Sequence, residues 1–393
     1  MNLKEEALKL HKEYKGKLAV KSKVKVETKE DLSIVYTPGV AEVCREIALD
    51  KSKVYDYTMK SNSVAVLTDG SAVLGLGNIG GEAALPIMEG KCVLFKNMAD
   101  VDAFPICLDT QDKDEIIDIA KKIAPVFGGI NLEDISAPKC FEIEEKLQDI
   151  GIPVMHDDQH GTAIVVLAAL INATKVVRKN IENLKIVISG VGAAGTAITK
   201  LLLCIGVDKK ICTSVKEIVL CDSKGIIYDG RPDLNEVKKA LAEYTNGSKR
   251  QGTLKDALEE ADVFIGVSKG NLLTSNDLKV MNEKAIIFAM ANPNPEIMPD
   301  EAKKVAAVVG TGRSDFPNQI NNSLAFPGVF RGALDAKATK INDEMKVAAA
   351  NAIANCIEPT ADNILPYTLD KKVASKVAEA VAKTAIETGV VRT

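Results

Sequence analysis

The chain has 393 residues, with 50 lysines and arginines against 54 acidic residues, eight cysteines, three histidines and no tryptophan. At about 100–200 residues per domain, this length predicts two domains or three small ones. A net charge of −4 provides no positive field for a phosphate backbone, which argues against general nucleic-acid binding. With so few histidines, acid–base chemistry is expected from carboxylates, lysine or tyrosine.

The apolar stretches and the N-terminal region predict a cytoplasmic protein with no membrane segment. The longest apolar run, Ala163–Ile171, is shorter than the roughly 20 residues needed to cross a bilayer. The first thirty residues are rich in lysine, but they also contain acidic residues and lack the apolar segment of a signal peptide. The cysteines form no C-x-x-C pair, so we expect reduced, mostly buried thiols.

In the first half of the chain, short apolar runs alternate with glycine-rich turns. Residues 3–15 have the spacing of an amphipathic helix, and residues 113–124 are predicted as another helix. The runs Ser63–Leu67 and Cys92–Lys96 are predicted as strands. Ile152–Met155 is predicted as a short buried strand that ends in a polar cluster.

The second half alternates strand and helix patterns. A long apolar helix is predicted at Thr162–Val177, and helical patterns such as Leu234–Tyr244 separate candidate strands. Alternating β and α units predict an α/β fold with a doubly wound parallel sheet, and the change of rhythm places a domain boundary near residue 160. The candidate strands are Lys185–Ser189, Glu217–Cys221, Val263–Val267, Ala285–Met290 and Val305–Val309.

The spacing G-x-G-x-x-G occurs twice, and its surroundings distinguish the two copies. Gly190-Val-Gly192-Ala193-Ala194-Gly195 follows a candidate strand and opens a helix, as in a Rossmann-type dinucleotide site. A pyrophosphate would lie against the free N–H groups of that helix. The other copy, Gly75–Gly80, is followed closely by Pro86, so its helix is expected to be too short. That copy is disfavoured as a dinucleotide site by itself, and a role in lining the same cleft stays open.

Two residues at strand ends bear on the cofactor. Asp222 ends a candidate strand 27 residues after Gly195, where an acid would accept hydrogen bonds from the ribose of NAD and repel a 2′-phosphate. Ser223 and Lys224 beside it could accommodate that phosphate, so NAD is favoured over NADP and both stay open. Asn292 follows the fourth candidate strand, at the carboxyl edge where doubly wound sheets bind ligands.

Two pairs of adjacent acids follow apolar runs near the expected boundary, namely Glu133-Asp134 and Asp157-Asp158. Carboxylates that are brought together repel one another unless a cation is present, and hard oxygen ligands suit Mg²⁺ or Mn²⁺. The alternative is solvated loop charge. The sequence therefore raises a divalent-cation site as a hypothesis.

Other candidate residues are ambiguous one by one. His156 and His160 have the i, i+4 spacing of a zinc helix, but a turn is expected there, which favours hydrogen bonds around the acidic residues. Lys91, beside an apolar run, would lose proton affinity if buried and could act as a base; the alternative is a packed stem with a solvated head. Tyr36 enters a turn, and Asn322 has no interpretation in isolation.

Together these motifs resemble malic enzyme in its short, mostly microbial form. They keep the family's order over residues 30–335. The resemblance implies an N-terminal substrate and metal domain at 1–160 and a Rossmann-type NAD(P)-binding domain with a helical tail at 161–393. The matching stretches are Tyr36–Val40, Thr68–Gly70, Gly75–Gly80, Glu89–Lys91, Leu132–Asp134, His156–Thr162, Gly190–Gly195, Ala291–Pro293 and Asn321–Gly328.

The resemblance also implies a reaction and a homodimer. L-malate would be oxidatively decarboxylated to pyruvate and CO₂, with reduction of NAD or NADP and a requirement for Mg²⁺ or Mn²⁺. Lys91 would take the C2 hydroxyl proton, Tyr36 would protonate C3 of the enolpyruvate, and Asp157 would belong to the proton network. Asn292 and Asn322 would contact substrate or nicotinamide. The metal ligands would be Glu133, Asp134 and Asp158.

One departure and two rival functions accompany the resemblance. Longer relatives have an arginine shortly after Thr-Asp-Gly that pairs with a substrate carboxylate, whereas this chain has Ser71-Ala-Val73. Another side chain or a loop amide would have to bind that substrate carboxylate.

The enzymatic rival to this function is a metal-assisted 2-hydroxy-acid dehydrogenase or malolactic-type enzyme. The other is a nucleotide-sensing regulatory protein, which would have no need of the carboxylate set.

Overall fold

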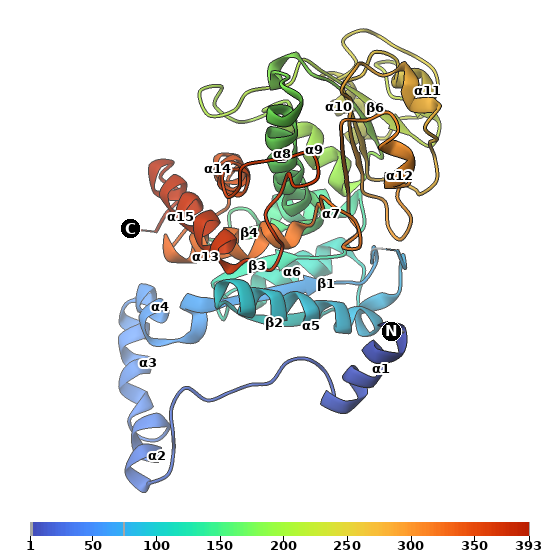
Figure 1. Cartoon of the computed structure of the whole chain (residues 1–393). Helices are drawn as coiled ribbons and strands as arrows, with labels where there is room; N and C mark the ends of the chain where they lie inside the picture. Colours follow the sequence, from blue (N-terminus) through green and yellow to red (C-terminus); the bar gives the residue numbers. More distant parts are fainter. Residues whose placement is uncertain (1–2, 74, 393) are drawn as a thin grey trace.

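Two mainly parallel sheets with covering helices form the body of the molecule (Figure 1). The computed structural model describes residues 3–73 and 75–392. The first sheet has the strand order β2-β1-β3-β4, all parallel. Its strands are β1 (Ser63–Thr68), β2 (Asp102–Cys107), β3 (Gly129–Leu132) and β4 (Val154–His156), connected by α5 (Gly80–Ala99), α6 (Lys113–Ile123) and α7 (Lys139–Leu147).

The second sheet has the order β10-β9-β8-β5-β6-β7, with only β7 antiparallel among the described strands. The order reverses at β5, and the crevice beside such a reversal is where doubly wound sheets bind ligands. The predicted α/β fold class is confirmed. The elements are β5 (Lys185–Ser189), α9 (Ala193–Leu202), β6 (Glu217–Asp222), β7 (Gly225–Ile226), α10 (Glu236–Ala242), α11 (Leu254–Ala257), β8 (Val263–Gly266), β9 (Ile286–Ala289), α12 (Pro299–Ala302) and β10 (Val308–Thr311).

Helix α8 (Asp157–Val177) links the two sheets and lies in the core. It has the length and apolar character of a membrane span, but 72% of its apolar window is buried inside the protein, as in a core helix. Three C-terminal helices follow the second sheet, and α13 and α15 pack back onto α5. These C-terminal helices are α13 (Phe326–Asp335), α14 (Asp343–Ala354) and α15 (Lys371–Glu387). The predicted domain boundary at residue 160 stays a prediction.

The first elements form an N-terminal arm, residues 3–57, which extends below the body in Figure 1. The structure buries none of the residues of its four α-helices. The helices are α1 (Leu3–Tyr14), α2 (Lys29–Val35), α3 (Val40–Leu49) and α4 (Val54–Tyr57). Short 3₁₀ turns occur at Lys51–Lys53, Met59–Asn62, Ile181–Asn183, Asp277–Val280 and Asn322–Leu324.

The strand predicted at Cys92–Lys96 is wrong, because this run lies within helix α5. Met88, Cys92 and Phe95 are buried on one face of that helix at helical spacing, and a short apolar run cannot distinguish a buried strand from such a face. The expectation of a stunted helix is also wrong, since α5 continues through Pro86.

Helix α8 begins at Asp157 rather than at the predicted Thr162. Asp157 and Asp158 occupy its first turn, where negative charge is favourable against the helix dipole. The predicted acidic turn is therefore the beginning of a helix. Smaller shifts occur at β10, which begins at Val308, and at α10, which is shorter than Leu234–Tyr244.

The expectation that all cysteines are reduced is wrong at one pair. Cys204 and Cys212 form a disulfide in the connection between α9 and β6. That connection brings their Cα atoms to 5.8 Å, within the range that a disulfide spans. The six other cysteines are free thiols.

Candidate active site

The two acidic pairs meet at the carboxyl edge of the first sheet. Glu133-Asp134 directly follows β3, and Asp157-Asp158 directly follows β4. Because these strands are parallel neighbours, with Leu132 opposite His156, both pairs emerge at the same edge. The two acidic pairs, which are far apart in the sequence, therefore lie together in the structure, as the hypothesis of a cation site requires.

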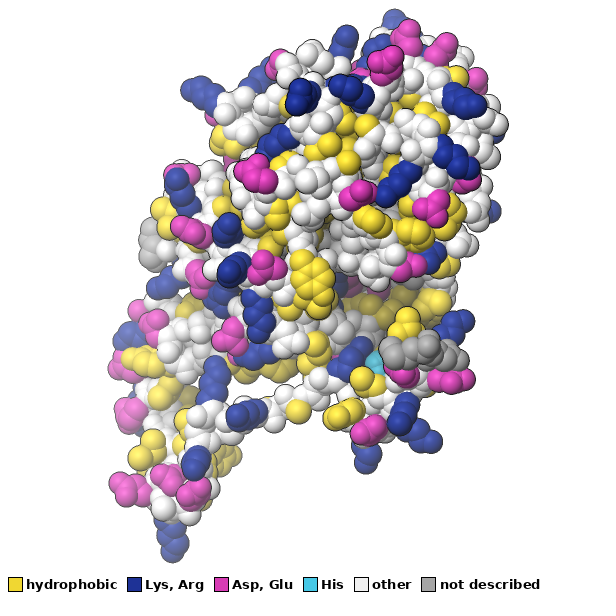
Figure 2. Space-filling view, viewed as in Figure 1, with side chains coloured by type: hydrophobic (Ala, Val, Ile, Leu, Met, Phe, Trp, Pro, Cys, Tyr) yellow, Lys and Arg dark blue, Asp and Glu magenta, His cyan; other side chains and the backbone are white. Residues whose placement is uncertain are grey.

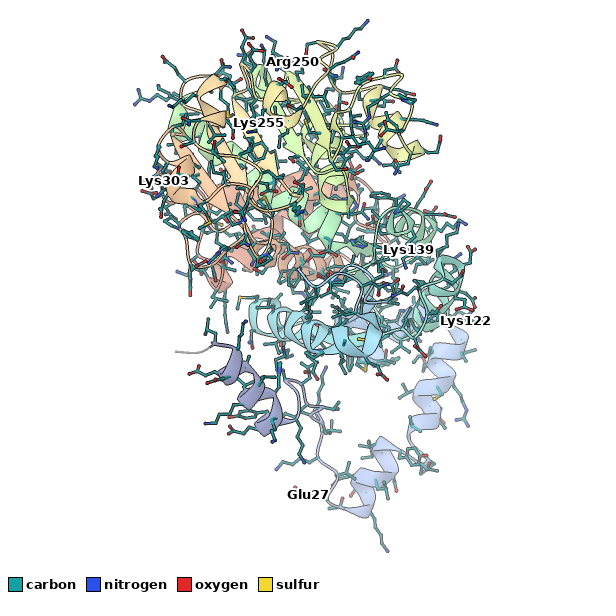
Figure 3. The ribbon with its side chains drawn as sticks, turned by 90° about the vertical axis from the view of Figure 1, so that its right-hand side faces the viewer. Glu27, Lys122, Lys139, Arg250, Lys255 and Lys303 are labelled. Carbon is teal, nitrogen blue, oxygen red and sulfur yellow. A yellow bond between two sulfur atoms is a disulfide. The ribbon has the colours of Figure 1, made fainter. Side chains whose placement is uncertain are left out.

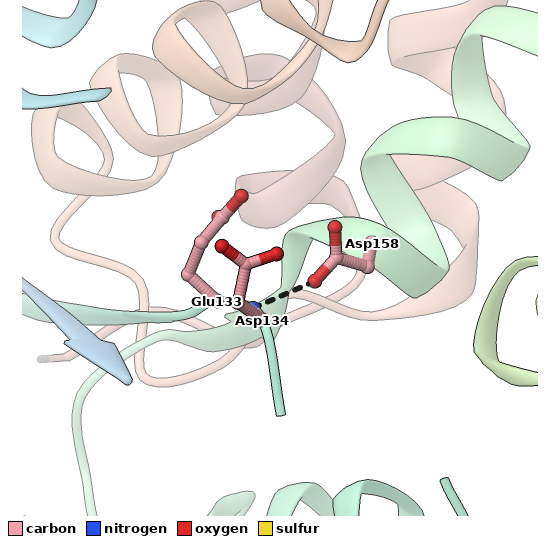
Figure 4. Close-up of side chains that lie close together, drawn as sticks. All are labelled: Glu133, Asp134 and Asp158. Atoms are coloured by element: carbon pink, nitrogen blue, oxygen red, sulfur yellow. Dashed lines mark hydrogen bonds between the residues drawn. The ribbon is translucent and has the colours of Figure 1, made fainter. Parts of the chain in front are cut away.

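Glu133, Asp134 and Asp158 each offer a carboxylate oxygen within 4.8 Å of the others (Figure 4). The backbone N–H of Asp134 donates to Asp158 Oδ2 at 2.8 Å, and Asn131 Nδ2 donates to Glu133 Oε2 at 2.8 Å. Burial raises the pKa of Asp158 to about 6, against the opposing effect of Lys91. Such a set of hard oxygens fits a Mg²⁺ or Mn²⁺ ion. Asn131 was missed in the sequence, although a polar residue within a buried strand is a usable signal.

Lys91 of α5 points into this cluster, with its side chain only 10% exposed. Its Nζ lies 2.5 Å from Asp157 Oδ2, 2.8 Å from Glu133 Oε1, and 4.2 Å from the centre of the Phe326 ring. Burial alone would lower the pKa of Lys91, but the neighbouring carboxylates outweigh it and raise that pKa above its ordinary value. The expected loss of proton affinity by a buried Lys91 is therefore wrong as long as the negative charge of these carboxylates is not offset by a cation.

Asp157 is completely buried and connects Lys91 to the C-terminal part of the chain. Its Oδ2 also accepts a hydrogen bond from Asn322 Nδ2 at 2.6 Å, while its Oδ1 has no partner within the described residues. A Cβ at Gly161 would lie 1.8 Å from that Oδ1, so only glycine leaves room for this carboxylate. Burial raises the pKa of Asp157 to about 7, although Lys91 opposes the shift.

The second glycine motif forms a tight loop between β5 and α9. Gly192 is the N-cap of α9, and a Cβ on Gly195 would lie 1.9 Å from the carbonyl oxygen of Gly190. Gly190 itself has a φ of 109° and passes close to the backbone of Val267. This arrangement suits a pyrophosphate at the start of α9.

The other cofactor candidates lie at the carboxyl edge of the second sheet. Asp222 accepts hydrogen bonds from Arg231 and from Lys238 Nζ, the latter at 2.6 Å. Burial would raise the pKa of Asp222, but these two cations lower it to about 2. Asn292 follows β9, and a Cβ at Gly75 would lie 3.8 Å from its carbonyl oxygen. The first glycine loop therefore lies next to this edge. Arg231 and Lys238 were not predicted as partners of Asp222, because no sequence motif marks them.

Tyr36 stands apart from the cluster. It caps the C-terminus of α2 on the N-terminal arm and is 68% exposed. Among the described residues, no hydrogen bond joins its side chain to the carboxylates or to Lys91. In Figure 3, Glu27 marks the same arm below the body, well away from Lys139 of α7. A single chain thus assembles the expected site without Tyr36.

The two histidines do not form a shared metal site. His156 is the N-cap of α8, and neither of its ring nitrogens has a hydrogen-bond partner in the described parts of the chain. His160 Nε2 lies 2.9 Å from Glu144 Oε2. The sequence predicted that both histidine side chains form hydrogen bonds around the acidic residues. Among the described residues only His160 forms one, and its partner is Glu144 of helix α7.

Comparison with known proteins gives the family. Residues 14–148 match the profile "Malic enzyme, N-terminal domain", and residues 159–386 match "Malic enzyme, NAD binding domain". The chain is 59% identical to the bifunctional malic/malolactic enzyme of Bacillus subtilis (strain 168), over 100% of this chain and 95% of that protein. It is 54% identical to the NAD-dependent malic enzyme of Geobacillus stearothermophilus, over 96% and 78% of the two chains.

A longer relative and a crystal structure agree with these matches. The NADP-dependent malic enzyme of Escherichia coli (strain K12) is 47% identical over 99% of this chain, which spans 53% of that protein. The NAD-dependent malic enzyme of Thermotoga maritima superposes with a TM-score of 0.92 at 50% identity, covering 96% of this chain and 98% of the other. The protein is an enzyme with a dinucleotide-binding fold. It belongs to the malic enzyme family.

Proposed function

We propose that this enzyme converts L-malate to pyruvate and CO₂ with reduction of NAD⁺ or NADP⁺ and with Mg²⁺ or Mn²⁺ as cofactor. The observation that supports it best is the buried contact of Lys91 with Asp157 and Glu133, directly beside the carboxylate cluster. The names of the relatives support the same substrate and oxidant.

Each residue of the cluster has a role in this reaction. A divalent cation held by Glu133, Asp134 and Asp158 would act as a Lewis acid toward the malate hydroxyl and carboxylate. With a bound cation offsetting the charge of these carboxylates, the neutral amine of Lys91 would remove the C2 hydroxyl proton. Asp157 lies close enough to Nζ to receive a proton from it. Asn322 holds the Asp157 carboxylate through its own hydrogen bond.

An assay of all products tests this function. Purified protein with L-malate, Mn²⁺ and either NAD⁺ or NADP⁺ should form pyruvate and reduced cofactor in equal amounts. Lactate without net reduction would instead support a malolactic enzyme, an alternative favoured by the name of the Bacillus subtilis relative. Reduced cofactor without pyruvate would indicate a simple dehydrogenase, and cofactor binding without any product would indicate a sensor.

The same assay determines the cofactor preference. The carboxylate of Asp222 favours NAD⁺, whereas Arg231 and Lys238 bring positive charge to the same strand end. The ratio of kcat/KM for NAD⁺ and NADP⁺ measures which influence is stronger.

Mn²⁺ affinity should fall as the pH drops below 6. Burial raises the pKa of Asp158 to about 6, and the ion binds only its deprotonated form. Affinity should therefore be greatest above this pH and decrease by about tenfold per pH unit below it for each competing proton. Titrations of Mn²⁺ from pH 5 to 8, followed by electron paramagnetic resonance of the free ion, measure this. A constant affinity across this range would contradict the assignment of Asp158 as a ligand.

We further propose that the enzyme is a homodimer in which the N-terminal arm packs on the partner. The arm exposes Leu32, Ile34 and Tyr36 at 51%, 66% and 68%. Figure 2 shows apolar side chains among the charged ones on its surface. An apolar surface of this kind is typical of a protein–protein interface. Because the cluster within one chain lacks Tyr36, an arm shared between protomers would supply it to the partner's site.

A further inference from the structure

Glu144 is a carboxylate on the inward face of α7. The other buried residues of that helix are Cys140, Ile143 and Leu147, and Glu144 is itself only 7% exposed. A buried charge is unfavourable unless hydrogen bonds and opposite charge satisfy it. The contacts of Glu144 therefore indicate what this position does.

Both oxygens of Glu144 are directed at the first turn of α8. Oε1 accepts the backbone N–H of His156 at 2.9 Å. Oε2 accepts Gln159 Nε2 at 3.1 Å and lies 2.9 Å from His160 Nε2. His156, the N-cap of α8, makes no side-chain cap bond in the described structure, and its own backbone N–H is satisfied by Glu144 of another helix. These contacts lie on either side of Asp157 and Asp158 in the sequence.

A third helix, α14, approaches Glu144 through His160. Lys346 of α14 lies 3.5 Å from His160 Nε2 and donates to Asp343 at 2.7 Å. Burial would raise the pKa of Glu144, but His160 and Lys346 lower it to about 2, so the carboxylate is charged. Glu144 thus joins α7 to α8, and His160 links this contact to α14. In the described parts of the chain, Glu144 forms no hydrogen bond or ion pair with the expected metal ligands.

We propose that Glu144 is a positioning residue for the metal site. By holding the backbone at His156 and the side chains of Gln159 and His160, it orients the first turn of α8 and so the carboxylates of Asp157 and Asp158. Residues just outside a metal's ligands commonly influence affinity in this way. The inference rests on the proposed function for the identity of the ion. A purely structural buried carboxylate would affect thermal stability and leave ion affinity unchanged.

Direct Mn²⁺ titration of the full chain separates these roles. For Glu144→Ala, the Mn²⁺ dissociation constant measured by electron paramagnetic resonance should rise about 10- to 100-fold. Glu144→Gln should give a smaller rise, because its amide oxygen still accepts one of the hydrogen bonds. Glu145→Ala is the matched control, since Glu145 is the next carboxylate of α7 and is exposed. Its constant should stay within twofold of the native value, and NADH binding should be unchanged in all variants.

Circular dichroism and the melting temperature show whether each variant is folded. A folded Glu144→Ala variant with a native-like Mn²⁺ constant would overturn the proposal. If that variant does not fold, Glu144→Gln decides, and a constant within twofold of native overturns it equally. Absence of Mn²⁺ binding by the native protein would instead refute the metal site of the proposed function, and this inference with it.

Discussion

Replacing Lys91 by alanine should lower kcat by about 10²–10⁴-fold, the range typical for loss of a general base. The amine is the basic group in contact with both Asp157 and Glu133, and its substitution leaves no nitrogen to take the hydroxyl proton of malate. NAD(P)⁺ binding should remain near the native level, because the glycine loop lies in the other sheet. Steady-state kinetics and cofactor titration measure the two effects.

The control for this substitution lies on the same helix. Lys96→Ala removes a half-exposed lysine of α5 that pairs with Asp100 and Asp102 at the surface. Its kcat should stay within twofold of native. Turnover of the Lys91→Ala variant within tenfold of native would show that another group is the base.

Mn²⁺ should stabilise the Lys91→Ala variant more than the native protein, because the substitution removes the cation that neutralises the buried carboxylates.

Mixed dimers should recover activity that both parent variants lack. Tyr36→Phe and Lys91→Ala are each expected to be nearly inactive. If Tyr36 acts in the partner's site, a heterodimer of the two variants contains one site with both native residues and one with neither. Random exchange makes half of the dimers heterodimers, so about a quarter of all sites should be active.

The alternative makes a different prediction for the same mixture. If Tyr36 reached Lys91 within its own chain, each site would contain one of the two substitutions and mixing would restore nothing. Mixtures prepared by co-expression with two affinity tags, followed by assay of the doubly tagged species, distinguish the arrangements. A control heterodimer of native and doubly substituted chains should be inactive in the shared arrangement, because each site then has one native residue.

Local sequence was sufficient for the elements whose signals are local. The strand Lys185–Ser189 and the glycine loop after it occur as predicted, since a buried strand followed by glycines needs no distant partner to be recognised. The meeting of Glu133-Asp134 with Asp157-Asp158 was also predictable. Acids that follow two parallel strands emerge at one edge whenever those strands are neighbours.

Where the charge of a residue depends on distant neighbours, local sequence was insufficient. From the sequence, Lys91 was expected to bind its proton more weakly if it were buried. The structure buries it, but its pKa is raised because carboxylates from two strand ends surround it. Asp222 was predicted as an acid open to ribose, and the structure pairs it with Arg231 and Lys238.

The sequence by itself determined the α/β class, the dinucleotide loop and the residues from which a metal site can form. Only the tertiary structure decided which groups face one another: Asn322 reaches Asp157 across 165 residues, and Glu144 reaches the first turn of α8. It also left Tyr36 exposed on the arm. The physical reason is that periodicity and turn preference act over a few residues, whereas electrostatics and hydrogen bonds in a buried site depend on distances that exist only after the sheets and helices pack.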